Sequence, residues 1–174
     1  MMARRRERGL SEGFKAGIFR WWFTGAVYFF IAFGTSLGTQ STPIDLLFFL
    51  GVGLGAGTAL LFNPIIFGVF NVKRPEGLWS LPYGERKIWQ NVLLIFIEVF
   101  RAWLLVTLVY LTYQAINLAA QQLMSLPEGT VTLGGEPILF ATFYLIYYSL
   151  LGKLIEGVKE AVAAAKAGKE GTQQ

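Results

Sequence analysis

The sequence predicts an all-α integral membrane protein, a bundle of four transmembrane helices with both termini in the cytoplasm. Three observations support this fold class. First, 54% of the 174 residues are hydrophobic and only 15% are charged, whereas soluble domains carry about 25% charged residues. Second, the apolar residues gather into four runs of about the 20 residues that a helix needs to cross a bilayer. Third, Lys and Arg residues flank these runs on one side only, as in cytoplasmic loops.

The first two runs are spans one and two. Span one covers residues 18–37 and opens with Arg20-Trp21-Trp22, a cation and two indoles that suit the membrane interface. No cleavage site with small residues follows it cleanly, so we expect span one to be retained and not removed as a signal peptide. Span two covers residues 43–70, and Pro43 suits its first helical turn.

The last two runs are spans three and four. Span three covers residues 90–117 and lies within residues 88–119. One alternative is a helix that starts near Pro82 and reaches about 57 Å at 1.5 Å per residue, which would put Glu98 and Arg101 near the cytoplasmic interface. Span four covers residues 138–155. Its aromatic residues are spaced three and four apart and therefore form one stripe, which we expect to pack in the core: Phe140, Tyr144, Tyr147 and Tyr148.

Two segments flank the four-span domain of residues 18–155, and a long outer loop lies within it. Residues 1–17 form a basic cytoplasmic arm. Residues 156–174 form an amphipathic cytoplasmic helix, which we expect along the membrane surface, and a disordered tail. The outer loop, 117–137, is acidic and rich in glycine, and Val131-Thr132-Leu133 between glycines is compatible with a small hairpin.

The distribution of basic residues sets the orientation. Cytoplasmic loops of membrane proteins carry an excess of Lys and Arg. The two loops on the opposite side, 38–43 and 117–137, contain none, and Arg101 lies inside span three. All other basic residues fall on one side, which is therefore cytoplasmic: Arg4, Arg5, Arg6, Arg8, Lys15, Arg20, Lys73, Arg74, Arg86, Lys87, Lys153, Lys159, Lys166 and Lys169.

The composition excludes many kinds of chemistry. The chain has no Cys and no His, which removes disulfides, thiolate chemistry, zinc sites of Cys and His, and any His-based triad or proton relay. We expect no cofactor and no metal. Basic residues beside apolar runs, with no single basic patch, argue against nucleic acid as a partner.

Glu98 and Arg101 are the strongest pointer to a working site. They are three residues apart, so they lie on one helix face, together with Asn91. Charges in the bilayer are costly, at about 2.5–3.5 kcal/mol each near its centre, and such residues face the protein interior, a cavity or a partner. Three interpretations stand: a structural pair near the cytoplasmic interface, a transport or coupling role, and a partner-binding role.

Span two is thinned by alternating glycines. Gly51 and Gly55 share one helix face, and Gly53 and Gly57 lie nearly opposite, so other helices can approach closely on both sides. Tight packing inside the bundle and contact within an oligomer are both compatible with this pattern. Further along, Pro64 removes one backbone hydrogen bond and favours a kink.

These glycines, the later Arg74-Pro75-Glu76 loop and a carboxylate on the next span together resemble the proteolipid rotor subunits of rotary ATPases. The sequence departs from that pattern in its glycine number, in the spacing from loop to carboxylate and in the basic Arg101 beside Glu98. We therefore infer no function from this resemblance.

The cytoplasmic loop between spans two and three alternates cations with aromatic residues and prolines. Such a loop suits the level of the lipid headgroups, where aromatics and phosphates hold it, or a docking site for a cytoplasmic partner. The residues concerned are Lys73, Arg74, Trp79, Tyr83, Arg86 and Lys87.

Two classes of function fit these patterns. In the first, the chain is a non-enzymatic accessory or structural subunit of a larger membrane complex in the cell membrane, with the lipid bilayer and other subunits, or itself, as partners. In the second, it is a component of an oligomeric channel or transporter, with Glu98 and Arg101 in the path. A membrane-embedded hydrolase or transferase ranks third, because no nucleophile–base set is recognisable.

Overall fold

The computed structural model describes residues 11–36, 43–69 and 85–170, with side chains described up to residue 165. Over these residues the chain is helical, with turns and bends between helices and no strand. The elements are α1 (Glu12–Ser36), α2 (Pro43–Gly57), the π-helical turn η1 (Thr58–Phe62), α3 (Asn63–Val69), α4 (Ile88–Met124) and α5 (Pro137–Glu170).

Four helices in the described parts of the chain are long and apolar enough to cross a membrane. They are Glu12–Ser36, the continuous run Pro43–Val69 formed by α2, η1 and α3, then Ile88–Met124 and Pro137–Ala165. The shortest has 25 residues, more than the 20 or so that a bilayer requires. The all-helical prediction with four membrane-length helices is therefore confirmed.

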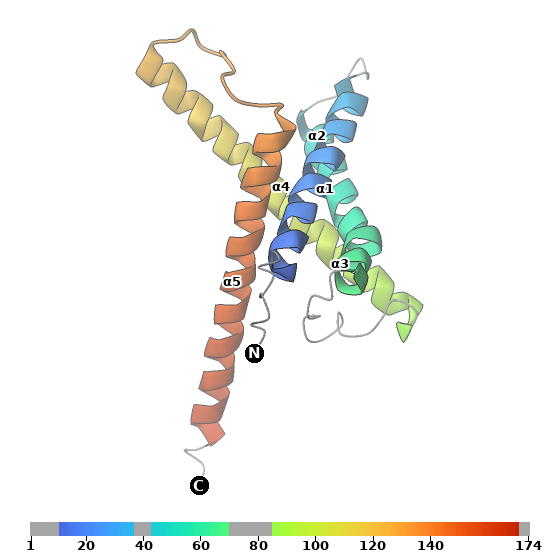
Figure 1. The fold of residues 1–174 in the computed structure, drawn as a ribbon. Coiled ribbons are helices and arrows are strands. Elements are labelled where there is room, and N and C mark those ends of the chain that lie inside the picture. Colours follow the sequence, from blue (N-terminus) through green and yellow to red (C-terminus); the bar gives the residue numbers. More distant parts are fainter. Residues whose placement is uncertain (1–10, 37–42, 70–84, 171–174) are drawn as a thin grey trace, which may run out of the picture.

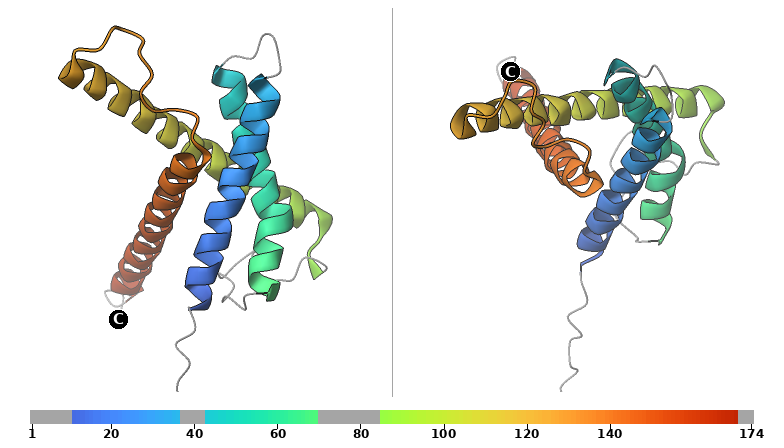
Figure 2. Two further views of the ribbon diagram at one scale, coloured as in Figure 1. Left: turned by 45° about the horizontal axis from the view of Figure 1, so that its top comes forward. Right: turned by 90° about the horizontal axis from the view of Figure 1, so that it is seen from above.

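The helices form a bundle in which α4 runs obliquely. α1 lies between α2 and α5 and contacts both (Figure 1). α2 makes its most extensive contact with α4. Both figures show α4 crossing the other helices at a steep angle, with its two ends projecting beyond them (Figures 1 and 2). At 37 residues, α4 is about 55 Å long, so an oblique course accommodates a helix longer than the hydrocarbon core.

The helix starts differ from those expected from the sequence. α1 begins at Glu12, six residues before the predicted span, because Ser11 caps it: the Phe14 backbone N–H donates to Ser11 Oγ at 3.3 Å. α4 begins at Ile88 and not near Pro82, because the backbone N–H of Lys87 in extended conformation donates to Gln90 Oε1 at 2.9 Å.

α5 continues as a helix beyond the predicted end of span four. It is one straight helix from Pro137 to Glu170 (Figure 1). The amphipathic segment therefore continues the predicted span in the same direction, without a bend near residue 155.

The hairpin considered for the outer loop is absent, since residues 125–136 form turns and bends. The side chain of Asn117 makes the backbone hydrogen bonds that a second strand would have made in a hairpin. Its Oδ1 accepts the backbone N–H groups of Thr132 and Leu133 at 3.0 and 2.8 Å, and its Nδ2 donates to the Leu133 carbonyl at 2.7 Å. α4 consequently extends seven residues past the predicted end of span three, and the loop is fastened to its last turns.

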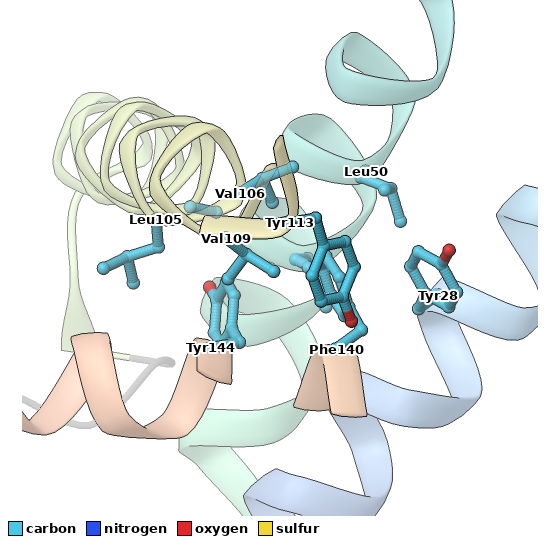
Figure 3. Packing of buried hydrophobic residues seen from close by; sticks show 10 residues of the cluster. Tyr28, Leu50, Leu105, Val106, Val109, Tyr113, Phe140 and Tyr144 are labelled. Atoms are coloured by element: carbon cyan, nitrogen blue, oxygen red, sulfur yellow. The ribbon is translucent and has the colours of Figure 1, made fainter. Parts of the chain in front are cut away.

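The main core fills the middle of the bundle. Figure 3 shows side chains of α4 meeting Leu50 of α2, Tyr28 of α1 and the aromatic stripe of α5. The rings of Tyr28 and Phe140 are stacked with centroids 4.3 Å apart. The aromatic stripe thus packs in the core, as expected. Phe140 and Tyr144 are buried, and Tyr147 and Tyr148 are partly buried against the same cluster.

Glycines bring α2 into backbone contact with α4. A Cβ added at Gly55 would touch the backbone of Val99, 2.6 Å from its nitrogen, and would lie 2.7 Å from the Glu98 carbonyl oxygen. A Cβ at Gly51 would lie 3.1 Å from the Cα of Trp103. Both glycines of this face therefore pack inside the chain, against the turns of α4 that carry Glu98 and Trp103.

The opposite glycine face packs against α1. A Cβ at Gly53 would lie 2.6 Å from the end of the Ile31 side chain and in ordinary contact with Val27, and a Cβ at Gly57 would lie 2.8 Å from the ring of Phe23. Both glycine faces of span two therefore contact other helices of the same chain.

We predict that Gly55→Ala destabilises the protein far more than Gly53→Ala. At Gly55 the new methyl group meets backbone that cannot rotate away, so we expect a loss of about 1–3 kcal/mol or more, as for other overpacked sites. At Gly53 the obstacle is the flexible tip of Ile31, and the helix gains propensity. The midpoint of thermal unfolding of each variant in neutral detergent measures the difference. Equal midpoints would show that α2 and α4 are not in backbone contact.

Candidate functional site

A cluster of charged side chains lies where α4 meets α1, α3 and α5. Glu98 and Arg101 are one turn apart on α4, and Arg101 Nη1 lies 3.8 Å from Glu98 Oε1. The Glu98 side chain is only 5% exposed and that of Arg101 is 20% exposed. The two residues expected to share a helix face do so, and they point into the chain.

A second cation of the cluster, Arg20, comes from α1. Its guanidinium carbon lies 3.7 Å from the ring centroid of Tyr148 on α5 and 5.0 Å from that of Phe62. The guanidinium carbon of Arg101 lies 3.9 Å from the same Tyr148 ring. Two guanidinium groups from different helices therefore share one aromatic ring, whose electron-rich face attracts cations.

The π-helical turn brings Asn63 into this region. Pro64 has no backbone N–H and its ring crowds the preceding turn. Just before it, the backbone N–H of Asn63 donates to the carbonyl of Thr58, five residues back, and the helix widens by one residue. Such π turns are rare and often accompany functional sites. Asn63 is buried, and its Oδ1 has no hydrogen-bond partner in the described part of the chain.

These side chains surround a cavity of about 350 Å³. Its walls come from the first turns of α1, from α3, from the third and fourth turns of α4 and from the middle of α5. The lining residues are Gly13, Ala16, Gly17, Arg20, Asn63, Ile66, Phe67, Glu98, Arg101, Leu145, Tyr148 and Ser149.

The cavity walls carry an excess of positive charge. Arg20 and Arg101 are both cationic, and Glu98 is the single carboxylate among the lining residues. Glu98 lies within electrostatic range of both cations. One negative charge therefore faces two positive charges where four helical segments meet.

The chemistry available here is binding and charge balance. The lining includes no Cys or His, and the described residues contain no group of three or more His, Cys, Asp or Glu placed to hold a metal ion. Toward the centre of the bundle, the described chain is closed by side chains no more than 1% exposed: Leu50, Leu54, Leu105, Val106 and Val109. The cavity therefore does not continue through a single chain.

The other residues singled out from the sequence lie apart from the cavity. Asn91 is on α4, half-buried, with Oδ1 unpaired among the described residues. Pro64 is exposed beside Asn63, and Arg86 and Lys87 precede α4. Four residues of the cytoplasmic loop lie outside the described residues: Lys73, Arg74, Trp79 and Tyr83.

Sequence reasoning missed Arg20 and Tyr148 as members of the site. Arg20 was interpreted as an interfacial anchor with Trp21 and Trp22, and Tyr148 as core. Trp21 in fact donates from Nε1 to Thr142 Oγ1 of α5 at 3.1 Å, which joins α1 to α5. The available signal was the position of Arg20 inside the first apolar helix, since an intramembrane cation needs a partner.

A second cavity, of about 460 Å³, lies at the opposite end of the bundle. Its walls include Tyr28 of α1, Tyr113 and Asn117 of α4, and Leu133 of the outer loop. None of its lining residues is charged, so the concentration of charge is specific to the first cavity.

No protein-family model matches this chain, and no curated protein and no solved structure was found to be significantly similar to it.

We predict that Glu98→Met destabilises the protein more than the double variant Glu98→Met/Arg101→Met. Removing the carboxylate leaves two guanidinium groups without an anion, and breaking a buried pair on one side costs about 3–5 kcal/mol. We expect the lower end of that range because Arg101 is partly exposed. Unfolding followed by circular dichroism in detergent measures both variants. Glu156→Met on the exposed face of α5 is the control and should change little. A double variant no more stable than the single one would contradict the pairing.

Proposed function

We propose that this chain is a non-enzymatic subunit of a larger membrane assembly in the cell membrane, with both termini in the cytoplasm. The location of the basic residues at one end supports the orientation. The observation that carries the proposal is the course of α4, whose two ends project beyond the other helices (Figures 1 and 2).

The projecting ends of α4 expose large apolar side chains. Ile88 at its start is 84% exposed, and Leu123 and Met124 at its end are 86% and 67% exposed. Within the described part of the chain, little covers these turns. Helices of a neighbouring subunit that lie across α4 would cover this surface and would hold the oblique helix in place, since close van der Waals packing drives association in lipid.

An apolar groove beside the crossing point supports the same proposal. It has a volume of about 230 Å³ and lies between α2 and α4, lined by Phe48, Val52, Phe96, Val99, Phe100 and Trp103. Phe96 and Phe100 are 73% and 68% exposed. These rings form the rim into which a side chain of a neighbouring helix would insert.

We predict that the protein purified from its native host in mild detergent has the mass of a complex and contains a partner at fixed stoichiometry. The double variant Phe96→Ala/Phe100→Ala removes the groove rim and should lose the partner. Phe33→Ala is the control, because Phe33 is also exposed, at 56%, but lies on α1 and does not line this groove. Native mass spectrometry compares the three. A wild-type chain that is monomeric, with no partner, would contradict the proposal.

A second candidate is an oligomeric channel or transporter component, with Glu98 and Arg101 in the path. The charged cavity favours it, because buried ionisable groups often mark ion pathways. The closed core of the single chain means that such a path requires several copies. Under this alternative, Glu98→Gln abolishes K⁺ or Cl⁻ flux in liposomes without changing assembly. Equal flux through the wild-type protein and the Glu98→Gln variant would show that Glu98 has no role in transport.

A further inference from the structure

We propose that the cavity lined by Arg20, Arg101 and Asn63 binds a phosphate group, supplied by the headgroup of an anionic phospholipid. This binding site is distinct from the partner surface on α4 and does not depend on it. The first argument is the charge of the walls, where two guanidinium groups face a single carboxylate. One further negative charge would balance the site.

The second argument is the hydrogen bonding of the two arginines. A guanidinium group carries five N–H donors. Within the described parts of the chain, neither Arg20 nor Arg101 donates a hydrogen bond to a protein acceptor: Arg20 contacts aromatic rings, and Arg101 lies 3.8 Å from the Glu98 carboxylate. Buried polar groups are nearly always satisfied in folded proteins. Arg101 Nε is buried and has no hydrogen-bond partner among the described residues, so this donor requires an acceptor atom from outside the chain.

The third argument is the match between these donors and a phosphate. Guanidinium groups bind phosphate through pairs of parallel N–H···O bonds, in a geometry that halide ions cannot use. Asn63 and Ser149 add an amide and a hydroxyl to the same walls. These groups suit the ester and hydroxyl oxygens that surround a lipid phosphate.

The fourth argument is location. The cavity lies beside the first turns of α1 and the end of α3, at the same end as the basic segments of the sequence. The positive-inside rule makes this end cytoplasmic, and the cytoplasmic leaflet is the one that carries anionic lipids. The volume of about 350 Å³ is sufficient for a headgroup phosphate.

The test uses the full-length protein, delipidated in neutral detergent, with dioleoyl-phosphatidylglycerol and dioleoyl-phosphatidylcholine as probes in native mass spectrometry. We expect retention of phosphatidylglycerol and little retention of phosphatidylcholine. Arg101→Gln should weaken phosphatidylglycerol binding by about tenfold, because it removes a charge-assisted contact. Lys153→Gln removes the same charge from an exposed position on α5 and should change binding by less than about twofold.

A second pair of variants leaves every charge in place. Gly17 lines the cavity, and a Cβ there would meet no other atom within 4 Å, so Gly17→Leu should fill the cavity without disturbing the fold. Gly152→Leu is its control, since Gly152 also has open space around its Cα but does not line the cavity. We expect Gly17→Leu to block phosphatidylglycerol binding and Gly152→Leu to preserve it.

Millimolar inorganic phosphate separates the two sources of the group. If phosphate fails to displace the lipid and binding depends on Arg101 and on Gly17, the lipid headgroup is the ligand. If inorganic phosphate binds by itself and its binding also depends on Arg101 and on Gly17, the ligand is free phosphate, and recognition of a phosphate group by this cavity is still supported. If Arg101→Gln behaves like Lys153→Gln, and Gly17→Leu behaves like Gly152→Leu, the proposal is wrong. The partner experiment on α4 is unaffected by any of these results.

Discussion

The backbone contact between α2 and α4 determines where the other elements can lie. Gly51 and Gly55 remove the side chains that would keep the two helices apart, and the turn of α4 that carries Glu98 rests directly on Gly55. The opposite glycines admit α1 to the other side of α2. The first turns of α1 then lie next to α3 and α5, and this is the arrangement that brings Arg20 to the charged cavity.

The charged cavity shows how a membrane-length chain accommodates ionisable groups. Each charge inside the spans carries a desolvation cost, which an opposite charge and an aromatic ring can offset in part. Here Glu98 opposes two arginines, and Tyr148 contacts both guanidinium groups. The residues involved come from helices that are far apart in the sequence, so the cluster also ties α1, α4 and α5 together.

Local patterns in the sequence were sufficient to predict the helices but not their assembly. The apolar runs predicted four membrane-length helices, and the spacing of Glu98 and Arg101 predicted that these two side chains share a helix face. Arg20 was missed because its neighbours belong to other helices and have no fixed spacing from it. The outer loop was misjudged because Asn117, a side chain within a helix, supplies the hydrogen bonds of a missing strand. The oblique course of α4 depends on packing, which has no local signature.

The length of α4 has a consequence for the choice of membrane. A hydrophobic helix longer than the surrounding hydrocarbon layer adjusts by tilting, and proteins are sorted among bilayers of different thickness through such mismatch. α4 meets α2 through backbone contact at Gly55 and through buried side chains of the core, so its inclination is fixed by the packing of the bundle. A mismatch with thicker or thinner lipids would therefore fall on the bilayer, which has to thin or thicken around the projecting ends of α4.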